Sequence, residues 1–128
     1  MVEKPLRRPC DNPADSEILT KQSPFFSADK IKIPMLIEQG ADDARVRPSE
    51  SEQMVDAIAK NYGRATYVLY PDEGHGALFH LTDRLDWYAR VDRFLAEHLG
   101  GRFEPMSGER YPGSTAIVRE IGIDPDTR

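Results

Sequence analysis

The sequence predicts an α/β protein, and the order of its apolar segments carries that prediction. Two short segments typical of buried strands, residues 32–40 and 65–70, are each followed by a longer segment with helical periodicity. A right-handed crossover would place the two strands side by side and parallel. We therefore expect a lead-in over residues 1–29, a βαβα core over residues 30–101 and an irregular tail over residues 102–128.

The lead-in is polar and broken by prolines, so we expect only one short helix in it, at residues 15–21. The first strand is predicted in KIPMLIEQG, residues 32–40. This apolar segment is too short for a typical helix and stops at Gly40. Its composition indicates a strand that is buried in a sheet.

The first helix of the core is predicted to begin at Ser49. Ser49 followed by Glu52 is typical of a capping box, in which each side chain satisfies an exposed backbone N–H, and Pro48 lies just outside it. Gly63 ends the helix. The residues expected on its packed face recur at helical spacing: Met54, Val55, Ile58 and Tyr62.

The second strand is predicted at ATYVLY, residues 65–70, which is rich in β-branched and aromatic residues and ends at Pro71. A helix then runs from Thr82 or Asp83 to Leu99, before two glycines. Its apolar stripe, which we expect to be core, comprises Leu85, Trp87, Tyr88, Val91, Phe94, Leu95 and Leu99.

Composition and charge argue against several classes of protein. The 128 residues include 17 Lys and Arg against 22 Asp and Glu, a net charge of −5, so we expect no nucleic-acid partner. No apolar run is long enough for a secretion signal or a membrane span, so we expect a soluble, cytoplasmic protein without a membrane partner. The single cysteine, Cys10, has no partner for an internal disulfide.

Side chains able to do chemistry follow both predicted strands. Asp42 and Asp43 come after the first strand and His75 after the second, and the carboxyl ends of neighbouring parallel strands meet at one edge of a sheet. A carboxylate that orients an imidazole is the acid–base part of a hydrolytic triad. The glycines on both sides of His75 favour a sharp loop, and a loop that is only hydrogen-bonded is the alternative.

A metal site is a further alternative in the same loop. His75 and His80 lie near Asp72 and Glu73 in the sequence, and such side chains bind zinc in other proteins. We keep this metal site only as an alternative and predict neither a metal nor a cofactor.

Four segments, taken in order, resemble a known family. GADDARV, SESEQMVDAI, TYVLYPDEGHG and RLDWYARVDRFLAEHLGGRFEP are similar to the C-terminal end of the peptidase domain of prolyl oligopeptidase family serine peptidases. The resemblance covers roughly residues 11–105 and implies the C-terminal portion of an α/β-hydrolase sheet. It also implies hydrolysis of peptide bonds.

The resemblance implies a role for three residues. Asp43 matches the triad acid, His75 matches the triad base, and Arg45 matches an arginine that contacts the substrate backbone. For Arg45 an ion pair with Asp42 or Glu73 is the alternative. Asp42 stands where members usually have asparagine, and we expect this extra carboxylate to raise the pKa of its neighbour.

The third member of a triad is missing from the sequence. The family places its serine in a GxSxG turn, and none of the seven serines here has that surrounding. We therefore expect the chain to be inactive alone and a peptide substrate to be cleaved only when another segment supplies the serine.

Two strands make an incomplete sheet, so the first strand is expected to leave one edge unpaired. An upstream polypeptide or a second copy in a homodimer would pair with that edge. A non-catalytic α/β module that binds a partner through this edge is the alternative function.

Overall fold

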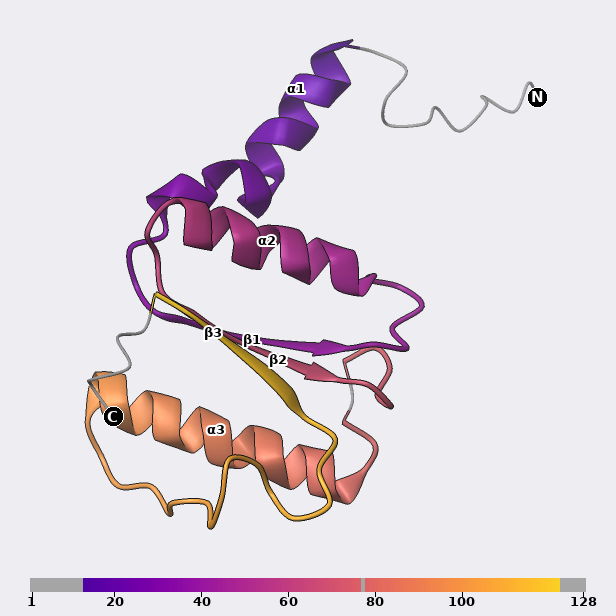
Figure 1. The fold of residues 1–128 in the computed structure, drawn as a ribbon. Coiled ribbons are helices and arrows are strands. Elements are labelled where there is room, and N and C mark those ends of the chain that lie inside the picture. Colours follow the sequence, from indigo (N-terminus) through magenta and orange to yellow (C-terminus); the bar gives the residue numbers. More distant parts are fainter. Residues whose placement is uncertain (1–12, 77, 123–128) are drawn as a thin grey trace, which may run out of the picture.

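The computed structural model describes residues 13–76 and 78–122 and shows a sheet with a helix on each face (Figure 1). This arrangement confirms the predicted α/β class. Cys10 lies outside the described residues. The elements, in order, are α1 Pro13–Gln22, the 3-10 helix η1 Pro24–Lys30, β1 Met35–Gly40, α2 Pro48–Lys60, β2 Ala65–Tyr70, α3 Leu81–Leu99 and β3 Ile117–Ile121.

β1 and β2 are parallel neighbours, as the βαβ pattern predicts. Their register runs from Met35 opposite Ala65 to Gly40 opposite Tyr70, so both strands end at the same level. The connecting helix α2 covers one face of the sheet and α3 covers the other (Figure 1). The loops that leave the two strands therefore start side by side.

The tail is not irregular throughout, which corrects the prediction for residues 102–128. β3 pairs antiparallel with β2, from Ile117 opposite Leu69 to Ile121 opposite Ala65, and the sheet order is β1-β2-β3. The backbone groups on the outer edge of β2 need hydrogen-bond partners, and the β-branched residues of β3 suit that position. Within the described chain the outer edge of β1 has no strand beside it.

The core lies between the sheet and α3. Val68 and Tyr70 of β2 are fully buried together with Ala116, and partly buried apolar side chains pack around them. Those side chains are Leu36, Leu78 and Trp87. On the other face α2 buries Val55 and Ile58 completely.

α2 starts one residue earlier than predicted, and not by a capping box. Pro48 occupies the first turn and Arg47 is the N-cap, with no side-chain capping bond. Proline suits this position because its φ is already helical and it has no N–H to leave unpaired. The helix ends at Lys60, so Tyr62 lies beyond it with a φ of 58° and is 96% exposed. The expected packing of Tyr62 is wrong.

α3 also differs from its prediction. Tyr88, Leu95 and Leu99 are exposed, whereas Asp83 and Asp86 are the buried residues of the helix. The predicted apolar stripe is therefore not the face that packs most deeply.

Donors from the tail explain why two carboxylates are buried there. Asp83 Oδ1 accepts hydrogen bonds from the Ser114 hydroxyl at 2.7 Å and the Thr115 N–H at 2.8 Å. Asp86 accepts from the Tyr70 hydroxyl, from the Arg90 guanidinium and from the backbone N–H of Tyr111. These bonds fasten the tail to α3 and β2.

Across the described ranges, no helix has the length and apolar composition that a membrane span requires.

Candidate active site

Two loops leave the carboxyl ends of β1 and β2 and are joined by their backbones. The N–H of Ala41 donates to the carbonyl oxygen of Tyr70 at 2.9 Å, and the N–H of Asp42 donates to that of Glu73 at 3.0 Å. Gly40 permits this approach, because a Cβ there would collide with the carbonyl oxygens of Glu73 and Gly74.

The loops bring Asp43 to His75. Asp43 Oδ2 lies 2.9 Å from His75 Nδ1, across 32 positions of sequence. The Asp43 side chain is 6% exposed and the His75 side chain 45%, so the carboxylate is enclosed and the ring is accessible. Of the two candidate carboxylates it is Asp43 that contacts the ring, while Asp42 is exposed.

The environment of Asp43 favours its charged form. Burial raises its pKa, but hydrogen bonds from the Val46 N–H, from the His75 ring and from the Arg45 N–H outweigh burial and lower the pKa to about 2. Both backbone bonds reach Oδ1 at 2.8 Å. The expected rise caused by Asp42 is wrong, because these donors decide the direction.

Arg45 lies in the same loop with its side chain exposed. Its backbone N–H holds Asp43, but the ion pairs of residues 13–76 and 78–122 do not include the proposed bridge from its guanidinium to Asp42 or Glu73. Among the described residues the Arg45 guanidinium is therefore exposed and makes no ion pair.

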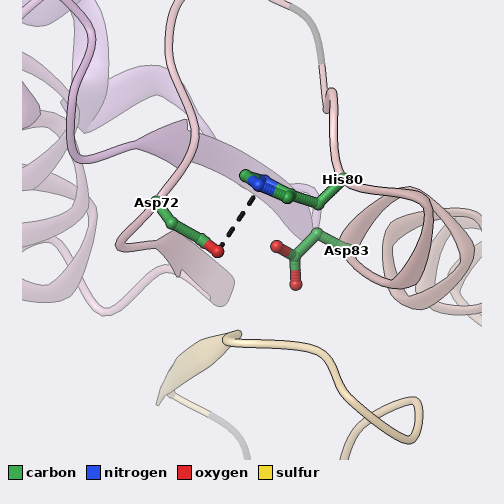
Figure 2. A group of neighbouring side chains, drawn as sticks. All are labelled: Asp72, His80 and Asp83. Atoms are coloured by element: carbon green, nitrogen blue, oxygen red, sulfur yellow. Dashed lines mark ion pairs between the residues drawn. The ribbon is translucent and has the colours of Figure 1, made fainter.

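The second histidine of the loop belongs to a separate cluster, and His75 is not part of it. Figure 2 shows Asp72, His80 and Asp83 together, with the ligand atoms of all three within 4.8 Å of one another. His80 Nδ1 lies 3.7 Å from Asp72 and 3.0 Å from Glu73 Oε1.

The carboxylates of this cluster already have hydrogen-bond donors. Asp83 accepts from Ser114 and Thr115, and Asp72 accepts from the Thr115 hydroxyl. The hydrogen bond to Glu73 raises the pKa of His80, burial lowers it, and the charges of Asp72, Glu73 and Asp83 raise it further. The cluster is therefore well described as a hydrogen-bonded anchor of the loop on α3.

The burial of two acidic residues near the pair was not predicted from the sequence. Glu73 is fully buried and Glu38, on β1, is half-buried. Burial and the charges of Glu73 and Asp43 raise the pKa of Glu38. An acidic residue inside an otherwise apolar strand was the signal for Glu38, whereas Glu73 has no pattern that distinguishes it from a surface residue.

Comparisons with known proteins bear on this arrangement. The model of the "Prolyl oligopeptidase family" matches residues 8–102. Dipeptidyl peptidase family member 6 of Caenorhabditis elegans is 41% identical over 106 residues, which cover 83% of this chain and 14% of that protein. Dipeptidyl aminopeptidase BIII of Pseudoxanthomonas mexicana is 44% identical over 111 residues, or 87% of this chain and 16% of that protein. No solved structure matches.

The chain therefore spans about a sixth of the length of these curated relatives.

Proposed function

Because the chain belongs to the prolyl oligopeptidase family, we propose that it supplies the acid and the base of a Ser–His–Asp triad to a serine peptidase. Its mixed sheet and flanking helices are part of an α/β-hydrolase fold. The observation that carries the proposal is the contact between Asp43 Oδ2 and His75 Nδ1 at 2.9 Å, on loops that follow adjacent parallel strands.

The geometry suits the roles. Asp43 would accept a hydrogen bond from Nδ1–H of His75 and so fix the tautomer in which Nε2 is the base. Nε2 would take the proton of the serine hydroxyl as it attacks the peptide carbonyl, and would then give that proton to the leaving amine. The low pKa of Asp43 keeps its carboxylate charged, which stabilises the imidazolium formed between these steps.

The serine would come from sequence other than the 128 residues described here, since no GxSxG occurs among them. Acid and base without a nucleophile do not form an acyl-enzyme, so we propose that the chain alone is inactive. The substrate would be a peptide, and we propose that Arg45, whose side chain is exposed, contacts its backbone.

One edge of β1 has no strand beside it among the described residues, and this edge supports the proposal of a partner. We propose that an upstream polypeptide carrying the serine pairs with this edge, because a buried strand needs hydrogen bonds on both sides. The same edge would serve a homodimer or the non-catalytic module that is the alternative function.

A fluorophosphonate probe tests the proposal, because it labels only an activated serine. The chain alone should remain unlabelled, and a serine-bearing upstream segment should become labelled when the two are co-expressed. His75→Ala should lower hydrolysis by about 10⁴-fold or more. His98→Ala, at the exposed end of α3, is the matched control and should retain activity.

Labelling of the chain alone would contradict the predicted inactivity. Hydrolysis that survives His75→Ala would contradict the triad assignment. If the chain and the upstream segment sediment together as a complex but the probe labels neither of them, the non-catalytic module is favoured.

A further inference from the structure

Glu73 is the fully buried acidic residue between the two loops. Its carboxylate accepts three hydrogen bonds: from the Phe79 N–H at 2.8 Å, from the His80 N–H at 2.7 Å and from the His80 ring at 3.0 Å. A buried carboxylate is costly unless it is paired in this way. The three donors make Glu73 a fixed point of the loop.

The donors lie on the far side of His75 in the sequence. Glu73 comes two residues before His75, and its carboxylate binds Phe79 and His80 after it. The two ends of the segment that carries the imidazole are therefore tied to each other by one side chain.

The backbone of Glu73 contacts the other loop as well. Its carbonyl oxygen accepts the N–H of Asp42, the residue before Asp43, and its own N–H donates to Tyr70 at the end of β2. Gly40 leaves the space for that carbonyl. Glu73 thus contacts the loop that carries Asp43, the loop that carries His75 and the end of β2.

We propose that Glu73 is a positioning residue that sets the His75 ring against Asp43. This inference deepens the proposed function and rests on it for its catalytic meaning. Glu73 does not touch His75, so it acts through the backbone that it holds. The Glu73 carboxylate accepts the backbone N–H groups of Phe79 and His80, and its carbonyl oxygen accepts that of Asp42, so these bonds hold residues on both sides of His75.

The charges that face the Glu73 carboxylate come from three elements. They are His80 in direct contact, Asp72 and Asp83 around that ring, and Glu38 from β1. Glu73→Gln keeps the volume but sets an NH₂ group against N–H donors, so one of the three bonds must be lost.

The test uses the chain as it is, with its histidines labelled with ¹⁵N. Nuclear magnetic resonance of the neutral rings reports whether the proton of His75 resides on Nδ1 or Nε2. In the unchanged chain Asp43 should hold it on Nδ1. In Glu73→Gln the ring should shift toward the Nε2–H tautomer that free histidine prefers.

Asp86→Asn is the matched control. Asp86 is also fully buried and also accepts several hydrogen bonds, but its partners tie α3 to the tail and to the Tyr70 side chain of β2, and none of them is a backbone group of the two loops. Both variants should lose thermal stability, and only Glu73→Gln should change the tautomer of His75. A tautomer that is unchanged in Glu73→Gln, or changed equally in Asp86→Asn, overturns the proposal.

His80→Ala covers the case in which Glu73→Gln fails to fold. It removes one of the three bonds at an exposed position and should shift the His75 tautomer in the same direction by a smaller amount. A His75 tautomer identical to that of the unchanged chain would then overturn the proposal.

The catalytic part is measured in the co-expressed peptidase. Glu73→Gln should lower kcat by about 10- to 100-fold with little change in KM, because the ring is displaced and the substrate contacts are not. The tautomer needs no serine and no substrate, so its result stands even if the proposed peptidase activity is absent. If Glu73→Gln shifts the His75 proton from Nδ1 to Nε2 but leaves kcat unchanged, the positioning role is overturned.

Discussion

The backbone N–H of Asp42 donates a hydrogen bond to the carbonyl oxygen of Glu73 at 3.0 Å, and this bond joins the loops of Asp43 and His75. This hydrogen bond depends on Gly40, because a Cβ at residue 40 would collide with the backbone of Glu73 and Gly74. The loops of Asp43 and His75 are thus joined by backbone contacts at the ends of two parallel strands, and the buried Glu73 carboxylate bonds to Phe79 and His80. Four predictions follow from these contacts and from the charges around them.

Asp43→Asn should lower kcat of the co-expressed peptidase by about 10³- to 10⁴-fold. An amide NH₂ facing His75 favours the wrong tautomer, even where the loop keeps its shape. The measurement is hydrolysis of a peptide substrate at saturating concentration. Asp42→Asn is the control and should retain activity, since the Asp42 side chain is exposed and contacts no ring. Equal losses in the two variants would argue against Asp43 as the acid.

The stability contributed by Asp43 should disappear in acid. Its pKa is lowered from the ordinary value of 3.8 to about 2 in the folded chain, so the unfolded chain binds the proton more readily. The contribution is complete above about pH 4 and declines as the pH falls toward 2. Urea unfolding at a series of pH values should show the difference between the unchanged chain and Asp43→Asn shrinking over that interval. A constant difference would contradict the lowered pKa.

Gly40→Ala should destabilise the chain by about 1–3 kcal/mol or more, because the added methyl group collides with backbone carbonyl groups that have little room to move. Thermal unfolding measures the loss. Gly108→Ala is the control, since a Cβ there would have its nearest neighbour at 3.9 Å. The unfolding midpoint of Gly40→Ala should lie clearly below that of Gly108→Ala. Equal midpoints would show that the two loops can move apart without loss of stability.

Glu38→Gln should stabilise the chain at neutral pH. Burial, and then the charges of Glu73 and Asp43, raise the pKa of Glu38, and its carboxylate accepts no hydrogen bond from the described residues. The free-energy cost of burying the ionised carboxylate is fully present above the raised pKa, and it disappears as the pH falls through that pKa. The gain in unfolding midpoint should therefore shrink in acid. Glu104→Gln, at an exposed position, should show no such gain.

The sequence predicted the parts of the site that depend on neighbouring strands. The adjacency of the two loops follows from the parallel pairing of β1 and β2, and the contact between Asp43 and His75 follows from the loops. The choice of Asp43 over Asp42 came from the resemblance to the family, and the geometry agrees with it.

The parts that were missed depend on partners far away in the chain. Asp83 and Asp86 are buried because Ser114, Thr115 and Tyr111 reach them, at separations of 25 to 32 positions. Helical periodicity counts only apolar side chains. The predicted stripe therefore included Trp87, which packs on the core, together with the exposed Leu95 and Leu99, and it left out the two buried aspartates. β3 was missed for a similar reason, because its pairing with β2 is visible only in three dimensions.

The fastening of the tail also constrains how the protein is made. Asp83 leaves the ribosome before Ser114 and Thr115, whose hydroxyl and amide groups donate to its buried carboxylate, whereas Asp86 already has Tyr70 and Arg90 as donors. During synthesis α3 cannot dock in its final place without enclosing the Asp83 charge before those donors have been made. The final packing of α3 is thus a late event, and a ribosome stalled before residue 111 would display a nascent chain whose last helix remains undocked.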